Sequence, residues 1–138
     1  MDMDLLELIT DPDLGGCRFH YWRSVETVNT KGRSEKTGTL LSAEGNIQPA
    51  PGKERELLEE GERQKAAILI FTPAALTAGE DTTKADRVHH DGGIYRVSLA
   101  EPWQQHAGFT KAVAVYERKA ARGELEAIAE TKARVENG

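Results

Sequence analysis

Short segments in which hydrophobic and polar positions alternate make up the first half of the chain. In residues 17–25 (CRFHYWRSV) the alternation predicts a strand with Phe19 and Tyr21 on one face. Residues 39–49 form a second expected strand, with a bulge or turn at residues 44–46. The polar stretch between them, residues 26–38, contains two glycines and indicates either a long loop or the tip of an extended hairpin.

A continuous apolar run, residues 65–72 (KAAILIFT), has the length of a strand and ends before Pro73. The Asp91-Gly92-Gly93 sequence further along predicts a hairpin, because glycine adopts a positive φ at little cost. Three more strands are therefore expected, at residues 86–90, 94–100 and 108–116.

Helical segments are expected to be short until the end of the chain. Residues 4–9 and 53–60 can each form a short helix, the second ending at Gly61, and residues 73–76 can form one turn. Residues 118–137 are rich in Ala, Glu, Lys and Arg and lack proline, which predicts a helix. Because its apolar stripe is thin, we expect this helix to pack on a neighbour or to project.

About six short strands at regular spacing predict a mainly β fold, a small β-barrel or a sandwich, with short helices and a C-terminal helical tail. Strands do not alternate with long helices, which argues against a doubly wound α/β fold. The chain has 138 residues, the length of one domain. We expect a single domain over residues 1–138, with a barrel core at about 17–117 and a helical tail at 118–138.

The net charge of −5 comes from the acidic start, because residues 1–13 hold five acids and no base. Such a balance differs from the strongly basic one of a dedicated nucleic-acid binder. The start also lacks the basic region of a secretion signal, which favours synthesis in the cytoplasm, and no apolar run approaches the roughly 20 residues of a membrane helix. One local segment is basic, with Arg18, Arg23, Lys31, Arg33 and Lys36 against Glu26 and Glu35.

Candidate chemistry is weak, so we expect no enzyme, no metal and no cofactor. Lys36 precedes the second glycine of residues 32–39, which is the wrong order for a phosphate loop. His89 and His90 are adjacent and would point to opposite faces of a strand. Cys17 and His20 would also face apart, about 10 Å from each other along the strand.

Aromatic residues are the other candidates for function. Trp22, Tyr95, Trp103 and Phe109 are expected in the core or at subunit contacts, because aromatic rings cover much apolar area. The aromatic and basic residues that alternate over residues 18–23 leave open a small barrel that binds single-stranded nucleic acid.

An ordered series of short motifs resembles a known family. The series is Ile47-Gln48-Pro49-Ala50, Gly52-Lys53-Glu54, residues 57–63 (LLEEGER), residues 65–72, Ala85-Asp86-Arg87-Val88, Asp91-Gly92, Tyr95-Arg96-Val97 and Glu101-Pro102-Trp103, closed by a strand at residues 109–116. In this order the motifs resemble the small head-closure, or head–tail joining, proteins of tailed bacteriophages. The resemblance covers about residues 19–116 and does not include the tail after Arg118.

The resemblance implies a structural protein of the virion neck, at the head–tail interface, with no catalytic residues. Such a stopper is a homo-oligomeric ring, a hexamer or a dodecamer, that joins a portal or adaptor protein to tail-terminator and tail proteins and retains packaged DNA, without membrane contact. Lys31, Arg33 and Lys36 would then lie on a loop that touches DNA non-specifically or contacts the next ring. A tail-terminator ring and a small nucleic-acid-binding barrel are the alternatives.

Overall fold

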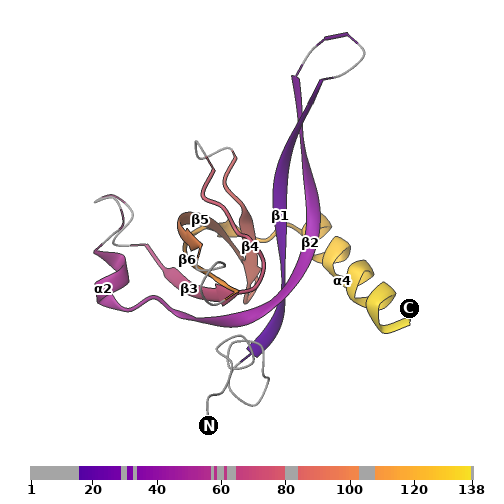
Figure 1. The fold of residues 1–138 in the computed structure, drawn as a ribbon. Helices are drawn as coiled ribbons and strands as arrows, with labels where there is room; N and C mark the ends of the chain where they lie inside the picture. The colour runs from indigo at the N-terminus through magenta and orange to yellow at the C-terminus, as the bar shows by residue number, and fades with distance from the viewer. Residues whose placement is uncertain are drawn as a thin grey trace.

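Six antiparallel strands close into one barrel, in the order β1-β2-β3-β6-β5-β4 (Figure 1). The computed structural model describes residues 16–28, 31–32, 34–56, 58, 61, 65–79, 84–102 and 108–137. The expected mainly β fold with a barrel and a C-terminal helix is confirmed. The strands are β1 (Gly16–Val28), β2 (Ser34–Pro49), β3 (Ala67–Thr72), β4 (Arg87–His90), β5 (Gly93–Pro102) and β6 (Thr110–Lys119).

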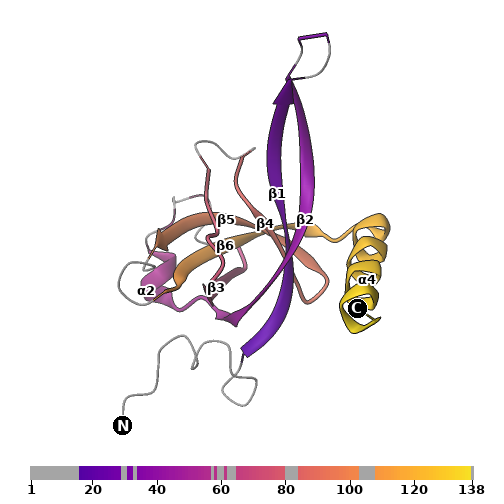
Figure 2. The same cartoon turned by 45° about the vertical axis from the view of Figure 1, so that its right-hand side comes forward.

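Strands β1 and β2 form a hairpin that is much longer than the barrel needs. They pair from Gly16↔Asn46 to Val28↔Ser34. β1 pairs with β4 only over residues 20–22, and β2 pairs with β3 only over residues 46–49. Beyond the Trp22↔Leu40 pair the hairpin projects from the barrel as a two-stranded ribbon in both views (Figures 1 and 2). Of the two alternatives for residues 26–38, a long loop or the tip of an extended hairpin, the structure shows the hairpin.

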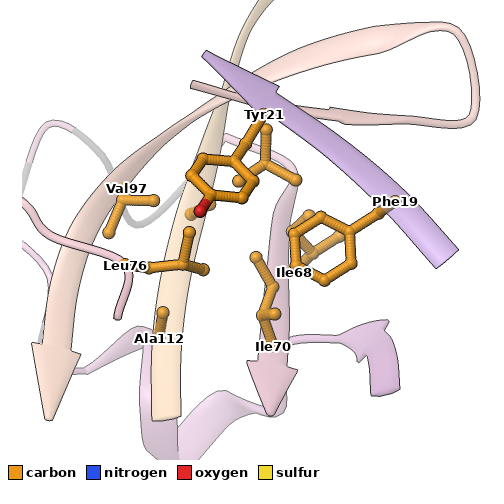
Figure 3. Close-up of a cluster of buried hydrophobic side chains, with 9 residues drawn as sticks. Phe19, Tyr21, Ile68, Ile70, Leu76, Val97 and Ala112 are labelled. Atoms are coloured by element: carbon orange, nitrogen blue, oxygen red, sulfur yellow. The ribbon is translucent and has the colours of Figure 1, made fainter. Parts of the chain in front are cut away.

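The barrel interior is filled by alternate residues of its strands (Figure 3). Phe19 and Tyr21 point inward together, as the alternation of β1 predicts. Small residues face them from β6, since a six-stranded barrel is narrow and leaves little room for side chains. The buried cluster consists of Phe19, Tyr21, Ile68, Ile70, Leu76, Val88, Val97, Ala112 and Ala114.

Strand β3 is buried on both faces, which explains why its sequence is a continuous apolar run. Ile68 and Ile70 point into the barrel, whereas Ala67 and Leu69 belong to a second cluster on the outside. Ala50 and Leu58, on the segment that connects β2 to β3, are buried in this second cluster. The connection therefore stabilises β3 by removing its outer face from water.

The Asp-Gly signal marks a tight hairpin turn, as the sequence predicts. His90 pairs with Gly93, so the loop holds two residues. Asp91 has a φ of 48° and Gly92 a φ of 77°. Positive φ at both central positions is typical of the turn type whose twist matches that of the flanking strands.

The expected bulge at residues 44–46 is wrong. Gly45 lies in a regular stretch of the β1–β2 pairing and faces Cys17. A Cβ atom at Gly45 would lie 2.4 Å from the Phe71 carbonyl oxygen and 2.9 Å from Thr72 Cβ. Glycine is needed here because β3 approaches closely, and the chain does not turn at this point.

The short helices also differ from expectation. The helix after Pro51, α2 (Gly52–Arg55), is a single turn, so Gly61 does not end it. Residues 73–76 form bends and no helical turn, because Leu76 is drawn into the barrel core. The helix expected over residues 4–9 lies outside the described residues.

The C-terminal helix, α4 (Arg122–Asn137), begins later than expected because β6 continues to Lys119. Glu124 caps it: its carboxylate accepts a hydrogen bond from the Ala121 amide at 2.9 Å. The same carboxylate pairs with Arg118 at 2.6 Å. The helix lies outside the barrel, beside the β1–β2 hairpin and on the side away from β3, in both views (Figures 1 and 2).

We predict that Gly45→Ala destabilises the protein by about 2 kcal/mol, because the added methyl group would overlap the β3 backbone. The measurement is the urea midpoint of unfolding, followed by circular dichroism. Gly123→Ala is the matched control. A Cβ atom at Gly123 meets open space on α4, so this change should leave the midpoint unchanged or raise it. Equal midpoints for Gly45→Ala and the parent would contradict the close approach.

Candidate functional site

The ribbon that leaves the barrel, residues 23–39, is the candidate functional element, and we call it the arm. Its strands pair from Arg23↔Thr39 to Val28↔Ser34, with Lys31 and Gly32 at the turn. At about 3.3 Å per residue, these strands carry the turn about 20 Å beyond the last barrel pairing. Among the described pairings, each arm strand pairs only with the other, so the arm adds surface without adding to the barrel core.

An ion pair fixes the base of the arm at the mouth of the barrel. Arg23, the first residue of the arm, donates from Nε and Nη2 to both carboxylate oxygens of Asp86, at 3.2 and 3.0 Å. The Asp86 side chain is fully buried, and this hydrogen bond holds the pKa of Arg23 above its ordinary value. The guanidinium also lies 5.6 Å from the centre of the Tyr21 ring. A bidentate pair of this kind sets direction as well as distance.

The same carboxylate holds the segment that closes the barrel mouth, residues 73–79, which we call the plug. The Thr77 amide donates to Asp86 Oδ2 at 2.9 Å, and Arg23 Nη2 also donates to the Ala75 carbonyl at 2.7 Å. Between these two contacts the Leu76 side chain enters the core, where it lies near Tyr21 and Ile70 (Figure 3). Arm, plug and β4 therefore meet at one buried carboxylate.

Charge pairing reduces the basic character expected for residues 18–36. Arg18 pairs with Glu44 at 3.0 Å, and Arg23 is held by Asp86. Beyond Arg23, residues 24–38 hold three basic and two acidic residues, a formal charge of +1. Lys31 is exposed at the turn, Lys36 stands opposite Glu26 in the register, and Arg33 lies outside the described residues.

The aromatic candidates are not gathered in one place. Phe109 is buried, with its ring centre 6.0 Å from that of Phe71. Tyr95 packs against the interior cluster and makes an edge contact with Tyr116 at 5.5 Å. Trp22 is half-buried on the outer face of β1, the face opposite Tyr21. Trp103 lies outside the described residues.

The alternation of side chains along β1 also places the residues that were weaker candidates for chemistry. Phe19 and Tyr21 lie inside the barrel, so they do not offer rings on which bases could stack beside Arg18 and Arg23. Cys17 is exposed and shares their side of β1, opposite His20.

Among the described residues, no group of three or more His, Cys, Asp or Glu side chains could hold a metal ion. No helix in the described part of the chain is long and apolar enough to cross a bilayer.

Sequence reasoning missed Asp86 as an organising residue. Asp86 was noted only as part of a motif and as the start of an expected strand. A single acid before a strand gives no local sign of burial, and its partner Arg23 is 63 residues away. The one available hint is that both residues border predicted strands.

The chain matches no protein-family model, and no curated protein matches it at a significant level.

We predict that Asp86→Ala destabilises the protein by about 3 kcal/mol, because it leaves the Arg23 guanidinium without its anion and the Thr77 amide without its acceptor. Urea unfolding at neutral pH gives the difference, provided the slope of the transition is unchanged.

Glu44→Ala is the matched control for this change. It removes an arginine–carboxylate pair on the same hairpin whose side chains are 44% and 52% exposed. Exposed pairs contribute about 0–1 kcal/mol, so the control should be nearly neutral. A loss for Asp86→Ala no larger than that for Glu44→Ala would show that the barrel mouth does not depend on the buried pair.

Proposed function

We propose that the chain is a structural protein of the neck of a tailed bacteriophage, a head-closure ring that joins the portal or an adaptor to the tail. The observation that carries the proposal is the arm, a long ribbon whose base is held to a small closed barrel by the Arg23–Asp86 pair. Together with the ordered motifs that resemble head-closure proteins, it favours a protein that works by assembling with copies of itself and with neighbouring rings.

The arm supports assembly because, among the described pairings, its two strands pair only with each other. A two-stranded ribbon alone is at best marginally stable in water, and its free edges invite pairing with another chain. The Arg23–Asp86 pair sets the direction in which the arm leaves the barrel. A ring closes through heterologous contacts, which require one surface of each copy to meet a different surface of the next at a fixed angle.

The charge of the arm bears on the role of DNA. A formal charge of +1 beyond Arg23 fits passing, sequence-independent contact with a phosphate backbone in a channel. It does not fit a site that must capture nucleic acid from solution. We therefore favour the neck ring over the small nucleic-acid-binding barrel, with packaged DNA as a neighbour and the rings above and below as partners.

The first test shortens the arm. Replacing residues 25–37 with Asn-Gly joins Ser24 to Gly38, which face each other in the register, by a two-residue turn. We expect the shortened protein to keep the midpoint of thermal unfolding within a few degrees. We also expect that the shortened protein does not restore complete particles when it is supplied to a phage whose gene for this protein is deleted. The parent protein should restore them.

Cryo-electron microscopy of particles made with the parent chain should show a six-fold or twelve-fold ring of barrels in the neck. Complete, infectious particles made with the shortened protein would show that the arm is not needed for assembly. A neck in which no density accommodates the barrel would contradict the proposed function itself.

The second test measures binding of the isolated chain to a fluorescent 30-base-pair DNA duplex between 50 and 300 mM salt. With three basic residues beyond Arg23, we expect weak binding and a slope of log affinity against log salt no steeper than about −3. Lys31→Gln should reduce that slope by about one. Tight binding with a slope of about −6 or steeper would favour the nucleic-acid-binding barrel instead.

A further inference from the structure

Two histidines lie side by side on the outside of the barrel. His20 on β1 and His89 on β4 face each other in the register. Their neighbours Phe19, Tyr21 and Val88 point into the core, so alternation turns both histidines outward. Directly opposite residues of an antiparallel pair have Cα atoms about 4.5–5.5 Å apart. The two imidazoles are therefore neighbours on one face of the sheet.

An outward histidine on a barrel is normally in contact with water, but His20 is buried and His89 is only partly exposed. His20 is 2% exposed, and His89 Nε2 is buried without a hydrogen-bond partner. Ile94 faces His89 in the register and is fully buried too. Ile128 of α4 is likewise buried, and α4 lies outside the barrel, beside the β1–β2 hairpin (Figure 2). Lys132 of α4 acts electrostatically on both rings, which indicates that the helix covers the face of the sheet that carries the two histidines.

Charges around the pair disfavour a proton on either ring. Burial lowers the pKa of His20 and of His89, and the ammonium of Lys132, on α4, lowers both further. His89 itself also lowers the pKa of His20. Two other side chains act in the same direction, Arg18 on β1 toward His20 and His90 on β4 toward His89.

Two carboxylates near His89 act in the opposite direction, but one of them is engaged elsewhere. Glu124 and Asp91 favour the protonated form of His89, and burial outweighs both. Glu124 is held by Arg118 at 2.6 and 2.8 Å and by the Ala121 amide. Its hydrogen bonds to Arg118 hold the pKa of Glu124 below its ordinary value. Its hydrogen bonds are thus made to Arg118 and to the helix cap, and its electrostatic attraction for a protonated His89 is outweighed by burial.

We propose that α4 is a strap that docks over neutral His20 and His89, and that protonation of these side chains in mildly acidic solution releases it from the barrel. Once the helix has left, both rings reach water, and the cost of burying a charge next to Lys132 is removed. Release uncovers Ile94 and Ile128, an apolar face that docking keeps from solvent. The inference rests on the burial of His20, Ile94 and Ile128 and on the effect of Lys132 on both rings, and it does not depend on the proposed function.

The direction of the pH dependence follows from which state binds more protons. In the undocked state both histidines have an ordinary pKa of about 6.5, whereas in the docked state their pKa is lower. Below about pH 6.5 the histidines of the undocked state bind protons, whereas those of the docked state stay neutral to a lower pH. Docking therefore weakens as pH falls and is fully present only above that value.

The experiment is hydrogen exchange of the full chain at pH 7.5, 6.5, 5.5 and 5.0, corrected for the intrinsic rates, with the ring carbons of the histidines followed by NMR. We expect protection of the amides of α4 to fall by about tenfold or more between pH 7.5 and 5.0, while that of β3 and β6 is retained. A helix that keeps its protection at pH 5.0, with both histidines titrating near pH 6.5, would overturn the proposal.

Variants separate the charge effect from general acid instability. His89→Leu removes a proton acceptor without removing a hydrogen bond from Nε2, so it should keep α4 protected to a lower pH. Lys132→Glu does not alter the packed layer, because Lys132 is exposed, and it should also shift release to lower pH. Arg134→Glu is the matched control, because it makes the same charge reversal two residues further along α4 and should not shift release.

The variant results complete the test. If His89→Leu does not fold, Lys132→Glu against Arg134→Glu still decides the question, since both change exposed positions. Equal shifts for the two charge reversals would mean that the overall charge of the helix, and not the histidine pair, controls docking. That result would overturn the proposal.

Discussion

The buried carboxylate of Asp86 is the constraint on which the functional geometry depends. It accepts hydrogen bonds from Arg23 at the base of the arm and from the Thr77 amide of the plug. Its own backbone bonds to Thr77 and Val97, so the carboxylate is fixed to β5 as well. A charge with no exposed surface is tolerable only when its hydrogen bonds are made, and here the groups that make them come from the arm and the plug. The pair therefore gives the arm a defined direction, which apolar packing alone would leave loose.

The features of the fold that could be predicted from the sequence are those set by neighbours along the chain. Alternation in β1 assigned Phe19 and Tyr21 to the interior, and the Asp91-Gly92 pair fixed a two-residue turn. The apolar run before Pro73 predicts a strand, and the structure confirms it. The run needs no polar positions because both faces of the strand are buried. Each of these inferences depends on the local preference of the backbone or on the two-residue period of a strand, and six such strands leave few arrangements other than a barrel or a sandwich.

The features that sequence reasoning missed depend on contacts between distant segments. Gly45 reads as a turn residue, and only the approach of β3 shows that it is there to leave room. Alternation turns His20 away from Phe19 and Tyr21, but nothing near it in the sequence shows that it is buried. Lys132, which acts on it, is on α4, more than a hundred residues later. In the candidate site, Lys31 could be placed at a hairpin tip from glycine and polar residues alone. The charge pairing that reduces the basic character of residues 18–36 could not be predicted, because Arg18 and Arg23 pair with residues far along the chain, Glu44 and Asp86.

Strand β1 connects the arm and the helical strap, and its alternation keeps them apart. Its inward residues, Tyr21 and then Arg23, lead from the core to the buried pair that directs the arm. Its outward residue His20 lies in the layer under α4. Because the two sides of a strand share a backbone but not side-chain neighbours, the helix can leave the outer face without loosening the hydrogen bonds at the barrel mouth. The arm direction and the cover over the histidines thus depend on separate interactions. One is the ion pair of Arg23 and Asp86, and the other is the packing around two outward rings whose burial lowers their pKa.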